Sequence, residues 1–186
     1  MFYYLNIIEY STIIVYSQIQ DYTRRCNMIC TIISDGSELD MNCRNEKEKP
    51  YPEIKGRLRE TIWKLFCEGY TGYYVNCEYG IPLWAAEIIT ALKLYNDIVL
   101  NIIVPFEEQC RDWCEENRDR YYAIHEKADS VVFACREFEE GCYDIAAEMM
   151  IDESYLAVIM GNSGSVENAE RYSRENSVAV RKISLF

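Results

Sequence analysis

Residues 75–87 read VNCEYGIPLWAAE, and this short stretch holds the junction that decides the fold. The residues leading into it, GYYVNC (72–77), have the aromatic and β-branched composition of a strand. The residues leading out, PLWAAEIITALKLY (82–95), form a helical pattern with a proline in the first turn, where proline is tolerated. Nucleotide-binding α/β proteins place glycines at such a junction to hold a phosphate. Only Gly80 could serve as a turn glycine here, so the stretch is a phosphate site, a former one or an ordinary loop.

Strands and helices alternate on both sides of this junction. Further strand-like runs are expected at 28–34, 97–106, 130–135, 155–161 and 177–186. Further helices are expected at 51–69, 107–128, 142–154 and 165–176. Strands that alternate with long helical patterns indicate βαβ units, whose right-handed crossovers cover both faces of a sheet. We therefore predict an α/β three-layer sandwich with a mostly parallel central sheet.

The size and charge of the chain limit its possible partners. The chain has 186 residues, of which 49% are hydrophobic, so one domain with a sizeable core is expected. Its formal net charge is −12. An acidic domain repels the phosphate backbone of nucleic acids, so no nucleic-acid partner is expected. A small anion could still bind, because a local group of backbone N–H groups can outweigh the global charge.

The first 20 residues, MFYYLNIIEYSTIIVYSQIQ, are apolar and rich in tyrosine and isoleucine. No basic segment precedes them, and Glu9 interrupts the run. This pattern predicts neither a membrane span nor a signal peptide, so no membrane association is expected. We expect residues 1–27 to be an N-terminal extension of unknown role, and residues 28–186 to form a single domain that begins at Met28.

The nine cysteines are an odd number without a secretion signal, which indicates reduced thiols and a cytoplasmic protein. Two pairs, Cys26/Cys30 and Cys110/Cys114, are four residues apart, whereas zinc sites usually use a tighter CxxC pair. Small buried hydrophobic residues are the simpler interpretation, and no metal or cofactor is predicted. His125 is the only histidine; it is expected on a helix, at the surface or half-buried.

Ligands of a parallel sheet bind outside the carboxyl ends of its strands. The loops expected there are 34–40, 76–82, 105–109, 135–143 and 161–165. In the last of them, GNSGS, Gly161, Gly164 and Ser165 lie at the start of a predicted helix whose N–H groups could bind an anion. The competing interpretation is that Ser163 or Ser165 caps this helix and no ligand is involved.

A series of motifs at these loops occurs in a distinctive order. The motifs are WAAE (84–87), PFxxQ (105–109), a following Trp113, RxRY (118–121), KAD (127–129) and GCY (141–143). In this order they resemble the YpsA-like family, which belongs to the SLOG group of Rossmann-like proteins and is related to the lysine-decarboxylase-like LOG proteins. The resemblance covers about residues 28–186. It implies an open Rossmann-like sheet and a pocket for a nucleotide or a nucleotide-derived ligand, without a settled enzymatic activity.

The chain departs from the family pattern at most of the expected ligand loops. The first loop, residues 34–37, lacks the histidine, arginine and proline of a TGHRP-like motif. The other replacements are Asn76 and Cys77 for two adjacent glycines, Glu78 for alanine, Pro82 for aspartate, and Ala146 and Ala147 for arginine and asparagine. Asp152 is kept, and residues 163–165 partly keep a GGT-like turn. These departures predict degenerate glycine loops, that is, ligand loops that have lost several glycines and polar residues of the family pattern.

The chemistry of the 76–80 loop argues against tight binding of a phosphate. Glycine lets the backbone approach the anion and adopt positive φ, and Cys77 is expected to prevent that approach. If Glu78 points at the anion, two like charges at ~4 Å repel by about 4 kcal/mol at an effective dielectric constant of ~20. The loop could instead bind a less anionic ligand through Asn76 and Glu78.

Two further side chains are candidates for ligand contacts. In LOG-type phosphoribohydrolases an arginine and a glutamate carry the cleavage of the glycosidic bond, and Glu87 is the corresponding weak catalytic candidate. No convincing arginine partner for Glu87 is evident from the sequence, so Glu87 is more simply a residue that orients the loop. Gln109 could contact a ligand through its amide or hold its own loop. Arg120 is expected to pair with a local acidic residue.

Three functions are consistent with these features. The first is a non-enzymatic SLOG-type protein that senses or sequesters a nucleotide-derived small molecule, possibly with a degenerate pocket. The candidate ligand-binding residues are Asn76, Glu78, Gly80, Glu87, Gln109, Gly161, Gly164 and Ser165. The second is a LOG-like phosphoribohydrolase with Glu87 as acid or base. The third is a homo-oligomeric interaction protein without a ligand, since its 16 tyrosines could anchor an interface.

Overall fold

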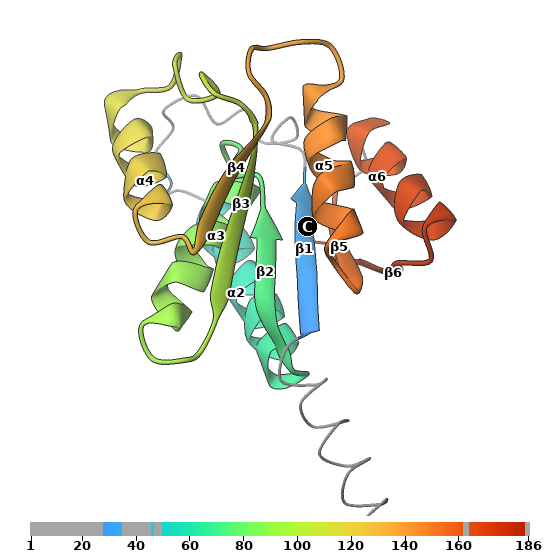
Figure 1. Cartoon of the computed structure of the whole chain (residues 1–186). Coiled ribbons are helices and arrows are strands. Elements are labelled where there is room, and N and C mark those ends of the chain that lie inside the picture. The colour runs from blue at the N-terminus through green and yellow to red at the C-terminus, as the bar shows by residue number, and fades with distance from the viewer. Residues whose placement is uncertain (1–27, 35–45, 47–49, 162–163, 185–186) are drawn as a thin grey trace, which may run out of the picture.

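Six strands form one parallel sheet in the order β4-β3-β2-β1-β5-β6 in the computed structural model, which describes residues 28–34, 46, 50–161 and 164–184 (Figure 1). The strands are β1 (Met28–Ser34), β2 (Tyr70–Val75), β3 (Val99–Phe106), β4 (Ser130–Cys135), β5 (Leu156–Met160) and β6 (Ala179–Lys182). The helices are α2 (Tyr51–Cys67), α3 (Ile81–Lys93), α4 (Glu115–His125), α5 (Cys142–Asp152) and α6 (Gly164–Glu175). The α/β three-layer prediction is confirmed, and every strand pair of the described sheet is parallel.

The chain first adds β2, β3 and β4 in turn on one side of β1, and then adds β5 and β6 on its other side. Because the direction in which strands are added reverses, the helices divide between the two faces of the sheet. Right-handed crossovers from β1 through β4 place α2, α3 and α4 on one face, and α5 and α6 cover the other (Figure 1). Each face has its own apolar core. The first is built around Trp84, Tyr73 and Leu100, and the second around Met150 and Ile159. This arrangement is Rossmann-like.

The strand order reverses between β1 and β5, which is the switch point where ligands of open α/β sheets bind. The loops that follow β1 and β5 include residues 35–45 and 162–163, which lie outside the described residues. The loops that follow β2, β3 and β4 are fully described. The carboxyl ends of all these strands lie at the same edge, toward the top of Figure 1.

The predicted elements agree with the structure except at their ends. The helical stripe of α2 buries Ile54, Leu58, Ile62 and Leu65 as expected. The region 107–128, predicted as one or two helices, contains turns up to residue 113 before α4 begins. The last strand is shorter than predicted and spans only Ala179–Lys182. The expected extension over residues 1–27 lies outside the described residues.

No helix in the described ranges combines the length and the apolar character needed to cross a membrane.

None of the seven cysteines in the described ranges forms a disulfide, and several, including Cys30 and Cys142, are completely buried. The buried thiols act as small hydrophobic side chains in the core, as expected, whereas Cys67 is exposed.

Candidate functional site

The loop between β2 and α3 is held by its own side chains. The side-chain Oδ1 of Asn76 accepts a hydrogen bond of 3.1 Å from the backbone N–H of Glu78. Gly80 has φ 107° and ψ −131°, a conformation that residues with a Cβ rarely adopt, and it is the N-cap residue of α3. Asn76 and Gly80 therefore shape the turn, and the Asn76 oxygen is already occupied within the loop.

The N-terminus of α3 lacks the usual compensating groups. No side chain caps it, and its first turn carries no acidic residue. Each of the other described helices has at least one acidic residue in its first turn. The N-terminus of a helix carries a partial positive charge, and the acidic residue that lies nearest to that of α3 in the chain is Glu78, two residues before the N-cap.

Cys77 turns its side chain into the core of the protein. Its backbone adopts φ 49°, in the left-handed region that a glycine would favour. Its side chain is completely buried in the core, and burial, followed by the nearby Glu87 carboxylate, raises the pKa of the thiol. The Cys77 side chain therefore lies in the core, and the expectation that it prevents close approach of a ligand stays a prediction.

Glu78 places a negative charge beside the start of α5. Burial raises the pKa of Tyr143 to about 12, and the Glu78 carboxylate and Cys142 add to this shift. Tyr143 belongs to the first turn of α5, so Glu78 lies near the N-termini of two helices. A carboxylate repels a phosphate that binds close to it, so the expected repulsion at the loop stays a prediction.

Gln109 is the most unusual polar residue at this edge. It lies in the connection from β3 to α4, and its backbone N–H donates to the carbonyl of Phe106 at 3.2 Å. Its side chain is only 6% exposed, yet its amide nitrogen and amide oxygen have no hydrogen-bond partner within the described residues. A buried polar group without a partner costs about 1–3 kcal/mol. A ligand that paired with this amide would recover that free energy.

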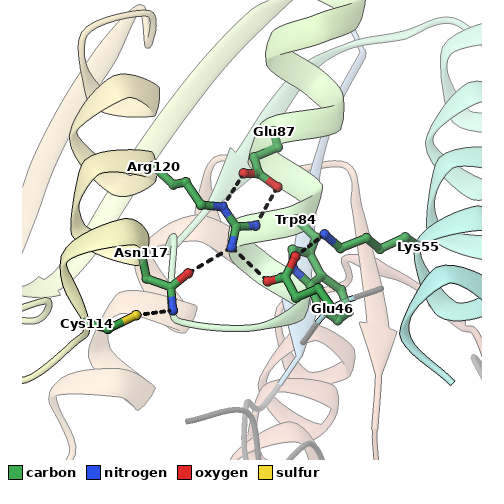
Figure 2. Close-up of polar contacts among 7 residues, drawn as sticks. All are labelled: Glu46, Lys55, Trp84, Glu87, Cys114, Asn117 and Arg120. Carbon is green, nitrogen blue, oxygen red and sulfur yellow. Dashed lines mark hydrogen bonds and ion pairs between the residues drawn. The ribbon is translucent and has the colours of Figure 1, made fainter. Parts of the chain in front are cut away.

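Glu87 belongs to a polar network that joins three helices (Figure 2). Arg120 on α4 donates from Nε and Nη2 to the two oxygens of Glu87 on α3, at 2.6 and 2.8 Å. Its Nη1 donates to Glu46 at 2.7 Å and to Asn117 at 2.8 Å. Glu46 also accepts from Lys55 on α2, and from the indole N–H of Trp84 at 3.1 Å. The network thus contains two acidic and two basic side chains, and their formal charges cancel.

Hydrogen bonds within the network favour the charged forms of Glu46 and Arg120. Burial alone would raise the pKa of Glu46, but hydrogen bonds from Lys55, Arg120 and Trp84 outweigh it and hold this pKa below its ordinary value. Burial would likewise lower the pKa of Arg120, but its bonds to Glu87 and Glu46 raise it.

Glu87 has an arginine partner in the structure, and the expectation that it has none is wrong. The expectation that Arg120 pairs with a local acidic residue is also wrong, since its partners Glu87 and Glu46 are 33 and 74 residues away in the chain.

The 161–165 loop is separated from the 76–80 loop. Gly161 follows β5 with φ 111°, and α6 begins at Gly164. Residues 162 and 163 lie outside the described residues, so the predicted cap at Ser163 is not described. Because β1 lies between β2 and β5, Gly161, Gly164 and Ser165 are two strands away from the α3 N-terminus. Asn76, Glu78 and Gly80 thus follow β2 and Gln109 follows the neighbouring strand β3, whereas the last loop follows β5.

Sequence reasoning missed the network residues Glu46, Lys55 and Asn117, because no short motif connects residues so distant in the chain.

Ala146 and Ala147, which replace polar residues of the family pattern, are buried in the core between α5 and the sheet. No group of three or more potential metal ligands occurs in the part of the chain that the structure describes. In the described residues this edge therefore offers the N-terminus of α3, the Glu78 carboxylate and the Gln109 amide, which has no partner there.

Comparison with known proteins agrees with this arrangement. A model of the YpsA family, described as the YspA SLOG family, matches residues 31–182. A UPF0398 protein of Macrococcus caseolyticus is 31% identical over 102 residues, which cover 55% of this chain and 56% of that protein. A UPF0398 protein of Halalkalibacterium halodurans is 32% identical over 120 residues, which cover 64% of this chain and 60% of that protein. The matched part thus spans less than two thirds of these relatives. The family match extends from β1 to β6, and the chain belongs to the YpsA SLOG family.

Proposed function

We propose that this chain is a non-enzymatic SLOG-type protein that senses or sequesters a nucleotide-derived small molecule. The observation that carries the proposal is the buried amide of Gln109, which has no partner within the described residues. Gln109 follows β3, one strand away from β2, whose following loop leads into the N-terminus of α3. A buried amide without a protein partner is expected where a ligand or an ordered water completes the hydrogen bonds, and we take a ligand as the partner here.

The polar network of Figure 2 argues against the alternative of a phosphoribohydrolase. A general acid or base must exchange a proton with the reacting group. Both oxygens of Glu87 are instead bound by Arg120, and each of the three guanidinium nitrogens donates to Glu87, Glu46 or Asn117. Glu87 therefore serves better as a structural anchor than as a catalyst. Incubation with nucleoside monophosphates and measurement of the released base tests this alternative, and release of base that depends on Glu87 would revive it.

Native mass spectrometry of the freshly purified protein tests the binding function directly. We expect a small nucleotide-derived molecule to co-purify and to be lost in the Gln109→Leu variant. Thr90→Val is the matched control, because Thr90 is also a buried polar residue without a partner for its hydroxyl but lies within α3, away from the loop. A protein that is empty and also ignores a panel of nucleotides and nucleosides would refute the proposal.

A ligand-free homo-oligomer is a second candidate, favoured by the outer edge of the sheet. β4 is one of the two terminal strands of the described sheet, and its Val132 and Phe133 are each 45% exposed. An unprotected apolar edge strand can pair with another chain. Light scattering should then report more than one chain per particle, and Val132→Lys should reduce the mass to that of one chain. A wild-type mass of one chain at micromolar concentration would eliminate this candidate.

A further inference from the structure

Three side chains from three different helices donate hydrogen bonds to the carboxylate of Glu46 (Figure 2). Nη1 of Arg120 and Nε1 of Trp84 donate to one of its oxygens at 2.7 and 3.1 Å, and Nζ of Lys55 donates to the other. Glu46 itself belongs to neither a helix nor a strand. The donors therefore come from the packed helices α2, α3 and α4, whereas the acceptor comes from a connecting segment.

Arg120 is held in place without the help of Glu46. Its Nε and Nη2 donate to the two oxygens of Glu87, at 2.6 and 2.8 Å. Its Nη1 also donates to Asn117 at 2.8 Å. A planar guanidinium that is bound along one edge has a fixed orientation. The Nη1 group of Arg120 would therefore keep its direction if the Glu46 carboxylate moved away.

Lys55 and Trp84 are also held by contacts that do not involve Glu46. Nζ of Lys55 lies 4.6 Å from the centroid of the Trp84 ring, which is a cation–π contact. The Trp84 side chain is almost completely buried, and its ring packs edge-to-face on Tyr51 with 6.1 Å between centroids. The three donors are thus preorganised, which lowers the entropic cost of binding an acceptor between them.

The charges of this network favour an anion at the position of the Glu46 carboxylate. When Glu46 is withdrawn, the network keeps two basic side chains and only one acidic side chain, so it carries one excess positive charge. The buried indole N–H of Trp84 also loses its acceptor, which is unfavourable. The oxygens of another anion meet both needs. Solvent reaches this place, because the side chains of Arg120, Glu46 and Lys55 are 20%, 23% and 28% exposed.

We propose that Lys55, Trp84 and Arg120 form a binding site for the carboxylate or phosphate group of a small molecule, and that Glu46 occupies this site as an intramolecular competitor. Because Glu46 is part of the same chain, its effective concentration at the site is high, and an external anion binds only as far as it displaces Glu46. The inference goes beyond the proposed function and does not depend on Gln109.

NMR titration of the full chain with inorganic phosphate, and separately with acetate, tests the inference at constant ionic strength. The signal to follow is the indole N–H of Trp84, which is assigned by its loss in Trp84→Phe. We expect Glu46→Ala to bind at least one of the two anions about tenfold more tightly than the wild-type chain. Glu46→Gln keeps the shape of the side chain without its charge and replaces Glu46→Ala if that variant does not fold.

Glu68→Ala is the matched control. It also removes one negative charge and one ion pair, because Glu68 contacts Arg181 at 2.8 Å, but it lies at the C-terminal end of α2. Its anion affinity at Trp84 should equal that of the wild-type chain. Lys55→Met, added to the Glu46 variant, should weaken the binding again by about tenfold.

Two results would overturn the inference. One is the absence of a saturable shift of the Trp84 signal in the Glu46 variants with both anions. The other is an equal gain of affinity in Glu68→Ala, which would reflect the net charge of the chain instead of a site. Gln109→Leu should leave this titration unchanged, so the failure of this inference and the failure of the proposed function are distinguishable.

Discussion

Arg120 on α4 holds Glu87 on α3 by two parallel hydrogen bonds, from Nε to Oε1 at 2.6 Å and from Nη2 to Oε2 at 2.8 Å. The two residues are 33 positions apart in the chain. Bidentate pairs of this kind are among the stronger polar contacts of proteins because both partners are planar. In this chain the pair fixes α4 against α3 next to the loop that we propose binds the ligand, and Figure 2 shows that Glu46 extends the connection to α2.

Arg120→Lys should lower the free energy of unfolding by about 1–3 kcal/mol, because lysine keeps the charge but cannot bond Glu87, Glu46 and Asn117 together. The estimate is modest because the side chains of Arg120, Glu46 and Glu87 are 20%, 23% and 33% exposed, and solvent screens them. Urea unfolding measures the change. The control is Arg111→Ala, since the Arg111–Glu108 pair is about 70% exposed and its loss should change stability by less than about 1 kcal/mol. Equal effects of the two substitutions would contradict a structural role for the network.

Gly80→Ala should destabilise the protein by about 1–3 kcal/mol, because alanine is strained at φ 107°. The control is Gly164→Ala, where a Cβ would have no heavy atom within 4 Å and the residue begins a helix. That substitution should leave stability unchanged or raise it slightly. Thermal or urea unfolding of both variants measures the two changes in the free energy of unfolding. Equal stability of the two variants would show that the Gly80 conformation is not required.

Gln109→Leu should raise the stability of the ligand-free protein by about 1–3 kcal/mol while removing ligand binding. The reason is that a buried amide without a partner is replaced by an apolar side chain of similar size. Active sites often show this opposition between stability and function. Unfolding of ligand-stripped protein in urea measures it, and a marked loss of stability would mean that the amide is satisfied in the folded chain.

Acid should destabilise the protein in two separate pH ranges. Burial lowers the pKa of His125 to about 4, so the unfolded chain binds a proton below pH ~6.5 that the folded chain does not bind until about pH 4. The free energy of unfolding should therefore fall as the pH decreases from about 6.5 to about 4. Glu46 has a lowered pKa in the folded state, so its contribution is lost only at lower pH, as this carboxylate becomes protonated.

His125→Gln isolates the first of these ranges. Its urea midpoint should change less between pH 7 and pH 4.5 than that of the wild-type protein. The ring of His125 lies 3.8 Å from that of Tyr121, measured between centroids, and its Nε2 atom is buried without a partner in the described ranges. An identical loss of stability in both proteins would show that His125 does not control the response.

Much of the fold could be predicted because strands and helices carry local signals. The apolar run of β3 indicated a strand buried on both faces, and its central residues are indeed buried. The stripe of α2 and the Gly80–Pro82 junction likewise located two helices correctly. The ends of elements were less predictable, as the turns before α4 show, because helix ends depend on contacts that periodicity does not reveal.

The sequence by itself determined the order of the elements, the parallel sheet, the loops at its carboxyl edge and the family. Only the tertiary structure decided what the side chains of those loops do. It turned Cys77 into the core, gave Glu87 the distant partner Arg120 and left the Gln109 amide buried without a partner in the described ranges. The physical reason is that secondary structure follows from contacts within a few residues, whereas burial and ion pairing depend on how α2, α3 and α4 pack on one face of the sheet.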